Sequence, residues 1–327
     1  MIKYVLKRLL QIIPVLLCVA IVIFTIMYFA PGDPVMLAIG DNYTPERYAE
    51  VAARMGLDKG YFGQLLDFLK SLFLHFDFGT SYILKTDIKT ELFARLPRTA
   101  LIAAVCCLLQ VVIAIPLGIT AATHQNGLVD RFCILLAMVG ISLPGFWVGM
   151  ILILVFAVYI PILPSSGVEH WYSYILPCVA NALMGVGSLT RMTRSQMLEV
   201  IRSDYVVTAR AKGVPERTIL YSHALPNALI PIVTFVGTHF GRALGGTVVI
   251  ETLFGIPGVG YYITQAVRNR DYPIVRGGVT LLALLFCLVV LIVDIVYAFI
   301  DPRIKAQYEG SGKKKKKRAV KEVAASV

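Results

Sequence analysis

Two ionisable side chains lie within one long apolar stretch of the sequence. His239 and Arg242 are three residues apart, so on a helix they share a face. A charged group at the centre of a bilayer costs about 2.5–3.5 kcal/mol even on a permissive insertion scale, so each such residue invites a functional interpretation. These two either pair with a carboxylate or a backbone carbonyl of a neighbouring helix, or face a pore and bind an organic carboxylate. Asp294, in another apolar stretch, could likewise pair with a basic residue.

A second segment, 201–226, combines basic charge with the start and stop signals of two short helices. Ser203 or Asp204 suits the N-cap of the first helix, and Gly213 suits its left-handed stop. Pro215 suits the first turn of a second helix, which we expect to end at Leu225 and Pro226. The first helix carries small residues beside two exposed cations. A slim, charged helix of this kind can enter a cleft on a soluble partner, although an ordinary basic loop would have the same composition.

A third segment interrupts the helical pattern after the fifth apolar run. It spans Glu251 to Gly260 and contains Gly255, Pro257, Gly258 and Gly260. We interpret it as a re-entrant or interfacial gate element, which is tolerated only where protein or water covers its backbone. The apolar runs contain no paired carboxylates, no Ser and His constellation and no His residues at metal-ligand spacing. The sequence therefore predicts neither a catalytic centre nor a metal site, which argues against an intramembrane enzyme.

The elements that must position these residues are membrane-spanning helices. The chain of 327 residues is 57% hydrophobic and 16% charged, and its mean hydropathy of +0.73 is too high for a water-soluble surface. A helix needs about 20 mainly apolar residues to cross a bilayer core. Six runs qualify, which predicts an all-α integral membrane protein with spans at Leu9–Ala30, Thr99–Ala122, Phe132–Ile160, Tyr174–Leu189, Asn227–Ile250 and Gly277–Ile300.

The spans divide the chain into four parts. Residues 1–30 hold the first span, and residues 31–98 form a small cap in which Thr44, Pro45 and Glu46 provide a helix start. Residues 99–300 hold the other five spans and the 201–226 segment, which falls between the fourth and fifth spans. Residues 301–327 form a basic tail that contains Lys313 to Lys317.

The distribution of Lys and Arg predicts the orientation. The N-terminus, the 201–226 segment and the tail are all basic, and short basic loops stay in the cytoplasm. Six spans place both termini on that side and the cap outside. The net charge of +11 thus reflects topology and contact with anionic lipid rather than nucleic-acid binding. Gly310 to Lys313 do not fit the spacing of a phosphate-binding loop, so no nucleotide site is expected in this chain.

The spacing from Ala209 through Gly213 to Leu225 and Pro226 resembles the EAA loop of ABC importer permeases. The chain departs from that pattern at three positions, Val207, Thr208 and His223. These departures are similar to the peptide and nickel branch of the family, to which a B-type subunit of dipeptide and oligopeptide permeases belongs. Further segments similar to that branch are Pro31–Pro34, Met55–Asp58, Asp77–Ser81, Arg191–Ser195, Glu251–Gly260, Arg270–Pro273 and Asp301–Arg303.

This resemblance implies the pore-forming subunit of an ATP-driven importer in the bacterial cytoplasmic membrane. The expected partners are a second permease subunit, similar or identical, two cytoplasmic ABC ATPases that use ATP and Mg²⁺, and an extracytoplasmic substrate-binding protein. The chain itself would bind no cofactor. The resemblance also implies that the 201–226 segment seats in the ATPase through Asp204, Tyr205, Ala209, Arg210, Ala211, Lys212, Gly213, Leu225 and Pro226.

The solute is less defined than the architecture. Peptides are favoured over nickel because the spans hold no cluster of His or carboxylates. Nickel or another small solute of the same family is the alternative. A secondary transporter would not explain the coupling segment, and it would normally need inverted repeats or helices broken at the midplane.

Overall fold

The computed structural model describes residues 2–40 and 43–300, and the regular structure in this part of the chain is helical apart from one isolated bridge between Thr80 and Asp87. The tail 301–327, with its predicted lipid contact and the Asp301–Arg303 motif, lies outside the described residues. The α-helices are α1 (Ile2–Tyr28), α2 (Pro34–Ile39), α3 (Pro45–Arg54), α4 (Tyr61–His75), α5 (Ile88–Thr123), α6 (Leu128–Ser142), α7 (Gly145–Ile153), α8 (Ile175–Ile201), α9 (Asp204–Ala211), α10 (Glu216–Thr218), α11 (Leu225–Leu253), α12 (Val259–Arg268) and α13 (Tyr272–Ile300).

Five helical stretches are long and apolar enough to cross a membrane: α1, α5, α8 with the turn before it, α10 to α11, and α13. The sixth span is a bent pair, in which α6 meets α7 and the π-helical segment Leu154–Tyr159 at 96°. The predicted span from Phe132 to Ile160 is therefore present as two helical segments at a sharp angle rather than as one straight run. Leu143 is extended because it precedes Pro144, whose ring disfavours a helical residue before it. Six spans result when the bent pair counts as one.

Two helix boundaries also differ from the sequence prediction. α5 begins at Ile88 rather than at Thr99, and the Asp87 carboxylate caps it by accepting the Thr90 N–H at 2.8 Å. The second short helix does not end at Leu225 and Pro226, because α10, a π-helical turn and α11 continue from Glu216 to Leu253. Pro226 lies in the first turn of α11, and the π-helical turn before it absorbs the missing N–H donor.

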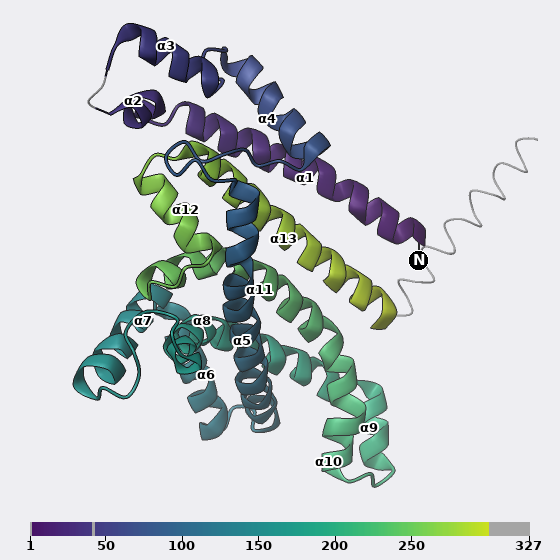
Figure 1. Cartoon of the computed structure of the whole chain (residues 1–327). Coiled ribbons are helices and arrows are strands. Elements are labelled where there is room, and N and C mark those ends of the chain that lie inside the picture. The colour runs from purple at the N-terminus through teal and green to yellow at the C-terminus, as the bar shows by residue number, and fades with distance from the viewer. Residues whose placement is uncertain (1, 41–42, 301–327) are drawn as a thin grey trace, which may run out of the picture.

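α8 is the most deeply buried span and packs against α5, α6, α7 and α11 (Figure 1). Glycines at the contacts allow this approach. A Cβ on Gly187 would lie 2.1 Å from the Ala137 carbonyl oxygen, and a Cβ on Gly118 would lie 2.5 Å from the Thr193 Cβ. Small residues at helix contacts are the usual means of bringing membrane helices together, because lipid provides no hydrophobic drive for association.

α1 and α13 pack against each other beside this group of helices (Figure 1). Arg8 of α1 and Asp294 of α13 form an ion pair with an N···O distance of 3.2 Å. The sequence left open that Asp294 pairs with a basic residue, and the structure identifies that residue as Arg8. Apolar helices rarely carry a charge into the bilayer without such a partner.

The cap residues fold into α2, α3 and α4 and a loop that ends at α5 (Figure 1). α3 begins at the predicted position, with the Thr44 hydroxyl accepting the Arg47 N–H at 3.2 Å. The Asp271 carboxylate, just before α13, accepts the N–H groups of Tyr82 at 3.1 Å and Ile83 at 3.3 Å. Segments that are far apart in the sequence and carry separate family-like motifs therefore meet at this end of the molecule.

A buried carboxylate joins α5, α11 and α12. Glu251 is 0% exposed. Its Oε1 accepts the Thr99 hydroxyl at 2.7 Å, and its Oε2 accepts the Tyr261 N–H at 2.9 Å. The Thr99 hydroxyl in turn accepts the Val259 N–H at 2.9 Å. Gly258 is needed here, because a Cβ at that position would lie 2.5 Å from Oε2.

We predict that Gly187→Ala destabilises the fold. The new Cβ would meet the α6 backbone at the Ala137 carbonyl, which cannot rotate away as a side chain can. A forced backbone shift of this kind costs about 1–3 kcal/mol. Gly245→Ala is the matched control, because a Cβ at Gly245 meets nothing within 4 Å. The measurement is the thermal unfolding midpoint of each purified variant in one detergent, and equal midpoints would contradict the packing described for α8.

We also predict that Glu251→Gln lowers stability. The amide NH₂ of glutamine would replace one acceptor oxygen and point at a hydroxyl or an N–H that needs an acceptor. A buried donor without a partner costs about 1–3 kcal/mol. Glu50→Gln serves as the control, since Glu50 forms only an exposed pair with Arg54. A wild-type melting temperature for Glu251→Gln would show that the carboxylate is not required for the contact among α5, α11 and α12.

Candidate functional site

Five elements of the core, α5, α6, α7, α8 and α11, enclose a cavity of about 570 Å³. Both ionisable residues that the sequence singled out in span five, His239 and Arg242, line it. None of the residues that line the cavity is an Asp or a Glu. The full lining is Gln110, Ile141, Pro144, Gly145, Phe146, Asn181, Met184, Gly185, Ser188, His239, Arg242, Ala243, Gly246, Val249 and Ile250.

The two predicted residues differ in their surroundings. The half-buried His239 ring stacks on Phe235, with 4.3 Å between ring centroids. Arg242 is exposed, and within residues 2–40 and 43–300 its guanidinium makes no ion pair and no hydrogen bond. Of the two alternatives derived from the sequence, pairing of Arg242 with a neighbouring helix is thus not found in the described part of this chain. Binding of an organic carboxylate stays a prediction.

Two amide side chains in the same cavity were not recognised as site residues from the sequence. Asn181 is 8% exposed, and its Nδ2 has no hydrogen-bond partner in the described part of the chain. Gln110 is 7% exposed and its Nε2 donates to the Cys106 Sγ at 3.2 Å. In the sequence Asn181 stands out only as a polar residue within the fourth span. Its spacing from Gly185 and Ser188 would place all three on one helix face, which is the signal that could have found the cavity wall.

The predicted coupling segment forms two short helices, α9 and α10, at the end of the molecule away from α2, α3 and α4 (Figure 1). Gly213 has φ +76°, so the left-handed stop is confirmed. Ser203 occupies the N-cap position, but its hydroxyl donates to the Val200 carbonyl at 2.6 Å instead of capping α9. Tyr205, Ala211, Lys212 and Gly213 are exposed on this protrusion and Ala209 is half-buried.

Arg210 connects the two helices of this protrusion. Its Nε donates to Glu216 Oε2 at 3.1 Å and its Nη2 to Glu216 Oε1 at 2.6 Å, which is a bidentate pair between α9 and α10. These hydrogen bonds raise the pKa of the Arg210 guanidinium, against a smaller opposing effect of desolvation. The predicted exposed cation is therefore present, but it holds the two helices together. Val206 and Ile219, both 0% exposed, anchor the protrusion to the core.

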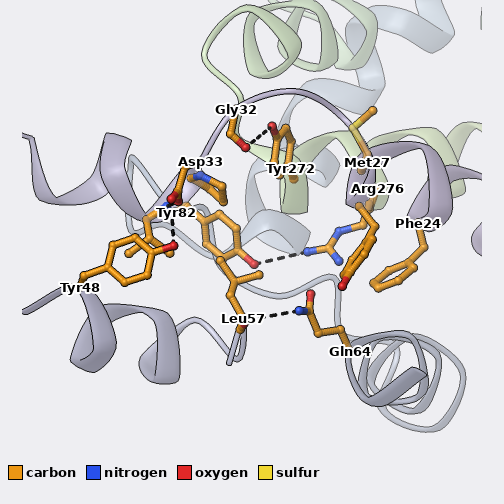
Figure 2. A pocket seen from close by; sticks show the side chains of 13 residues that line it. Phe24, Met27, Gly32, Asp33, Tyr48, Leu57, Gln64, Tyr82, Tyr272 and Arg276 are labelled. Atoms are coloured by element: carbon orange, nitrogen blue, oxygen red, sulfur yellow. Dashed lines mark hydrogen bonds between the residues drawn. The ribbon is translucent and has the colours of Figure 1, made fainter. Parts of the chain in front are cut away.

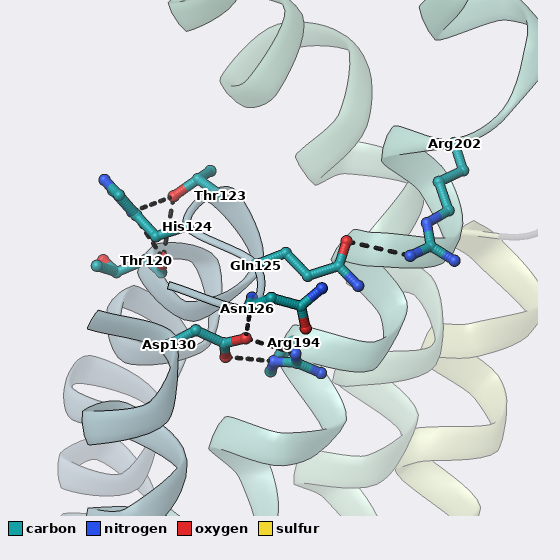
Figure 3. Close-up of polar contacts among 8 residues, drawn as sticks. All are labelled: Thr120, Thr123, His124, Gln125, Asn126, Asp130, Arg194 and Arg202. Atoms are coloured by element: carbon teal, nitrogen blue, oxygen red, sulfur yellow. Dashed lines mark hydrogen bonds and ion pairs between the residues drawn. The ribbon is translucent and has the colours of Figure 1, made fainter. Parts of the chain in front are cut away.

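A second bidentate pair ties α8 to the first turn of α6 (Figure 3). Arg194 Nε donates to Asp130 Oδ1 at 2.6 Å, and Arg194 Nη2 donates to Oδ2 at 2.7 Å. The Asn126 N–H also donates to Oδ2, at 2.8 Å. About two turns further along, at the C-cap of α8, Arg202 donates to the Gln125 side chain at 3.1 Å. Sequence reasoning included Arg194 only as part of a motif and did not find Asp130, because the two are 64 residues apart.

The predicted gate segment forms a covered turn between α11 and α12. Gly255 has φ +60°, and the Ile256 N–H donates to the Glu251 carbonyl at 2.9 Å. The Gly167 N–H donates to the Phe254 carbonyl at 3.1 Å, and Ile256 is 0% exposed. Protein thus covers much of this irregular backbone, but Gly255 itself is exposed, and the role of the segment as a gate stays a prediction. Gly258 and Gly260 lie against Glu251, and Pro257 lies between the two helices.

A smaller cavity of about 310 Å³ lies between the end of α1, the cap and α13 (Figure 2). Arg276 donates to the Tyr82 hydroxyl at 3.5 Å and lies over the Phe24 ring, 5.2 Å from its centroid. Burial raises the pKa of the Tyr82 phenol, and the nearby Arg276 opposes this effect. The Tyr48 hydroxyl donates to Asp33 Oδ2 at 2.8 Å, and this hydrogen bond raises the Tyr48 pKa. Most of these polar groups pair with one another, but the buried Arg276 Nε has no hydrogen-bond partner in the described part of the chain.

Comparison with known proteins identifies the family to which this architecture belongs. Residues 114–306 match the family described as binding-protein-dependent transport system inner membrane component, and residues 1–103 match the N-terminal part of such a membrane component. A putative peptide transport system permease protein of Brucella abortus is 39% identical over 309 residues, which cover 92% of this chain and 98% of the relative. The glutathione transport system permease protein of Salmonella typhimurium is 38% identical over 305 residues, covering 93% and 99%. The chain therefore belongs to the family of binding-protein-dependent transport system inner membrane components, as a multi-pass permease subunit and not an enzyme.

Proposed function

We propose that this permease subunit forms half of a pore through which an ATP-driven importer moves di- and oligopeptides into the cytoplasm. The observation that carries the proposal is the large cavity, in which Arg242 has no partner in the described part of the chain and no lining residue is acidic. A peptide always brings a carboxylate to such a cavity. The names of the two relatives, peptide and glutathione permeases, support the same class of substrate.

Nickel is the second candidate, because the sequence resemblance includes nickel permeases. Nickel sites use imidazole and carboxylate ligands. Among the described residues no three His, Cys, Asp or Glu side chains come together as metal ligands would. Arg242 would in addition repel a metal cation near the cavity. The balance of charge in the cavity therefore favours a solute with a carboxylate.

A second permease subunit is the first proposed partner. Large apolar side chains beside the cavity are exposed, among them Trp147, Met184 and Val249 at 44%, 43% and 52%. A similar or identical permease packed over this side would close the pore wall. Two cytoplasmic ABC ATPases would supply ATP and Mg²⁺ chemistry and receive α9, while this chain would bind neither. A substrate-binding protein would dock on the outer side, where we place the cap.

The proposed orientation follows from the charges. The α9–α10 protrusion is basic and would face the cytoplasm, whereas α2, α3 and α4 lie at the opposite end of the molecule (Figure 1). Both termini would then be cytoplasmic. The binding protein and the ATPases would thus contact opposite ends of this chain, as import from outside to inside requires.

A labelling experiment tests this orientation. We expect a cysteine at Tyr43, which is 52% exposed, to react with an impermeant maleimide in intact cells. A cysteine at the exposed Arg217 should react only after the membrane is permeabilised. A Cys18→Ser background removes the exposed native thiol. Labelling of the Arg217 cysteine in intact cells would contradict the orientation.

The coupling role is tested at Gly213. At φ +76° a β-branched residue is strongly disfavoured, so Gly213→Val should distort the end of α9. We expect at least about tenfold lower peptide uptake and substrate-stimulated ATP hydrolysis by the reconstituted complex, because strain of about 1–3 kcal/mol falls on the segment that seats in the ATPase.

Gly213→Asn is the matched control for this variant. Asn tolerates the left-handed region, and a Cβ at Gly213 meets nothing within 4 Å in this chain. It should therefore retain most activity. Loss in both variants would indicate a close contact with the ATPase rather than backbone strain, and full activity in both would remove the coupling role of this segment.

A further inference from the structure

We infer that the 570 Å³ cavity is a binding site for the C-terminal carboxylate of the transported peptide, with Arg242 as its charge partner and Asn181 as a second donor. The inference rests on the proposed peptide substrate and adds which end of the peptide the pore recognises. It also assigns residues from two different helices, α8 and α11, to one ligand group.

The charges in the cavity select an anion. Its lining contains one arginine, one histidine, two amides and the Ser188 hydroxyl, and it contains no carboxylate. Arg242 is exposed in this chain alone, so its field would be screened less than in water once a second permease subunit covers the open side of the cavity. A negatively charged group would therefore be drawn toward Arg242, and the amino group of a peptide would be repelled.

Arg242 has the geometry that a carboxylate needs. The planar guanidinium presents parallel N–H donors, which bind both carboxylate oxygens at once. Within the described residues these donors are not used by an ion pair or a hydrogen bond of this chain. The neighbouring His239 is held against Phe235 on the same helix, so it does not compete for the guanidinium as an acidic residue would.

Asn181 provides an independent indication of a ligand. The residue is only 8% exposed, and its Nδ2 has no partner in the part of the chain that the structure describes. Buried amides are normally satisfied, since an unpaired donor loses its hydrogen bonds to water and gains nothing in return. The Nδ2 atom itself has almost no accessible surface, so the amide must turn toward the adjoining cavity for a ligand carboxylate oxygen to supply the missing acceptor.

The rest of the cavity tolerates different peptides. Small residues leave it open, and a Cβ on Gly246 would meet nothing within 4 Å. Apolar side chains, namely Ile141, Met184, Val249 and Ile250, form much of the remaining wall. Such a wall accepts varied side chains, whereas the two donors recognise a group common to all peptides. The volume lies in the usual range for small-ligand sites of about 300–1,000 Å³.

The test is equilibrium binding of tri-alanine to the assembled complex in nanodiscs, without the binding protein, in competition with tri-alanine amide. We expect the amide to bind at least about tenfold more weakly to the wild type, because it lacks the negative charge. Arg242→Gln should weaken tri-alanine binding by about tenfold and abolish the difference between the two peptides. Arg242→Lys should retain part of the difference, because it keeps the charge and loses the bidentate contact.

Asn181→Ala is a second test of the inference, which stays informative if Arg242→Gln prevents the complex from assembling. It removes a group without a protein hydrogen bond, so the melting temperature should stay unchanged or rise while tri-alanine affinity falls about fivefold. Val249→Ala, an apolar change in the same wall, should preserve the preference for the free carboxylate.

Three results would overturn the inference. One is equal binding of tri-alanine and its amide to the wild type. Another is loss of assembly in Arg242→Gln together with wild-type binding by Asn181→Ala, which would assign Arg242 to a partner subunit. The third is no binding up to about 10 mM in a complex that transports tri-alanine. A complex that transports no peptide but another solute would instead refute the proposed function, and the inference with it.

Discussion

The close approach of α8 to its neighbours is the contact on which the rest of this structure depends. In lipid the helices gain little by hiding apolar surface from one another, so association relies on packing at short range. Gly118, Gly185 and Gly187 permit that packing, because each faces an atom of a neighbouring helix where a Cβ would not fit. The same helix carries Asn181 into the cavity and Arg194 into the pair with Asp130. Its position therefore fixes both the cavity wall and the base of the coupling segment.

Buried polar contacts determine how the ends of the helices are positioned, because apolar packing is not directional. Glu251 joins α5, α11 and α12 near one end of the core, and Asp130 joins the α5–α6 turn to α8 near the other (Figure 3). Each of these carboxylates has two or more donors, which offsets its loss of water. Arg242 and Asn181 lie between these two joints and have no such partners in the described chain. Their place in the cavity lining, together with this lack of partners, is the basis for proposing that they bind a ligand.

Much of this architecture follows from local sequence patterns. The apolar runs, the helix start at Thr44 and the left-handed Gly213 each depend on residues a few positions apart, and each is present as predicted. The contacts of Asp130 and Glu251 could not be found in that way, because their partners lie 64 and 152 residues away. Pro144 illustrates an intermediate case. Its ring alone indicates an interruption of the helix, but the size of the bend, 96°, depends on how α7 packs on α8.

The proposed coupling segment connects two of the helices that line the cavity, so these contacts would transmit movement between the segment and the cavity. α8 leads directly into α9, and α10 leads through a π-helical turn into α11. The two helices that enter and leave the segment are thus the two that carry Asn181 and Arg242. The pair between Arg210 and Glu216 makes α9 and α10 move together, and the pair between Arg194 and Asp130 makes α6 follow α8. A force applied at α9 would reach Asn181 through the Arg202–Ser203 junction and α8, and Arg242 through α10, the π-helical turn Ile219–Ala224 and α11. The hydrogen bonding of the turn Ile219–Ala224 is not α-helical, so bending on the second route is most easily absorbed there.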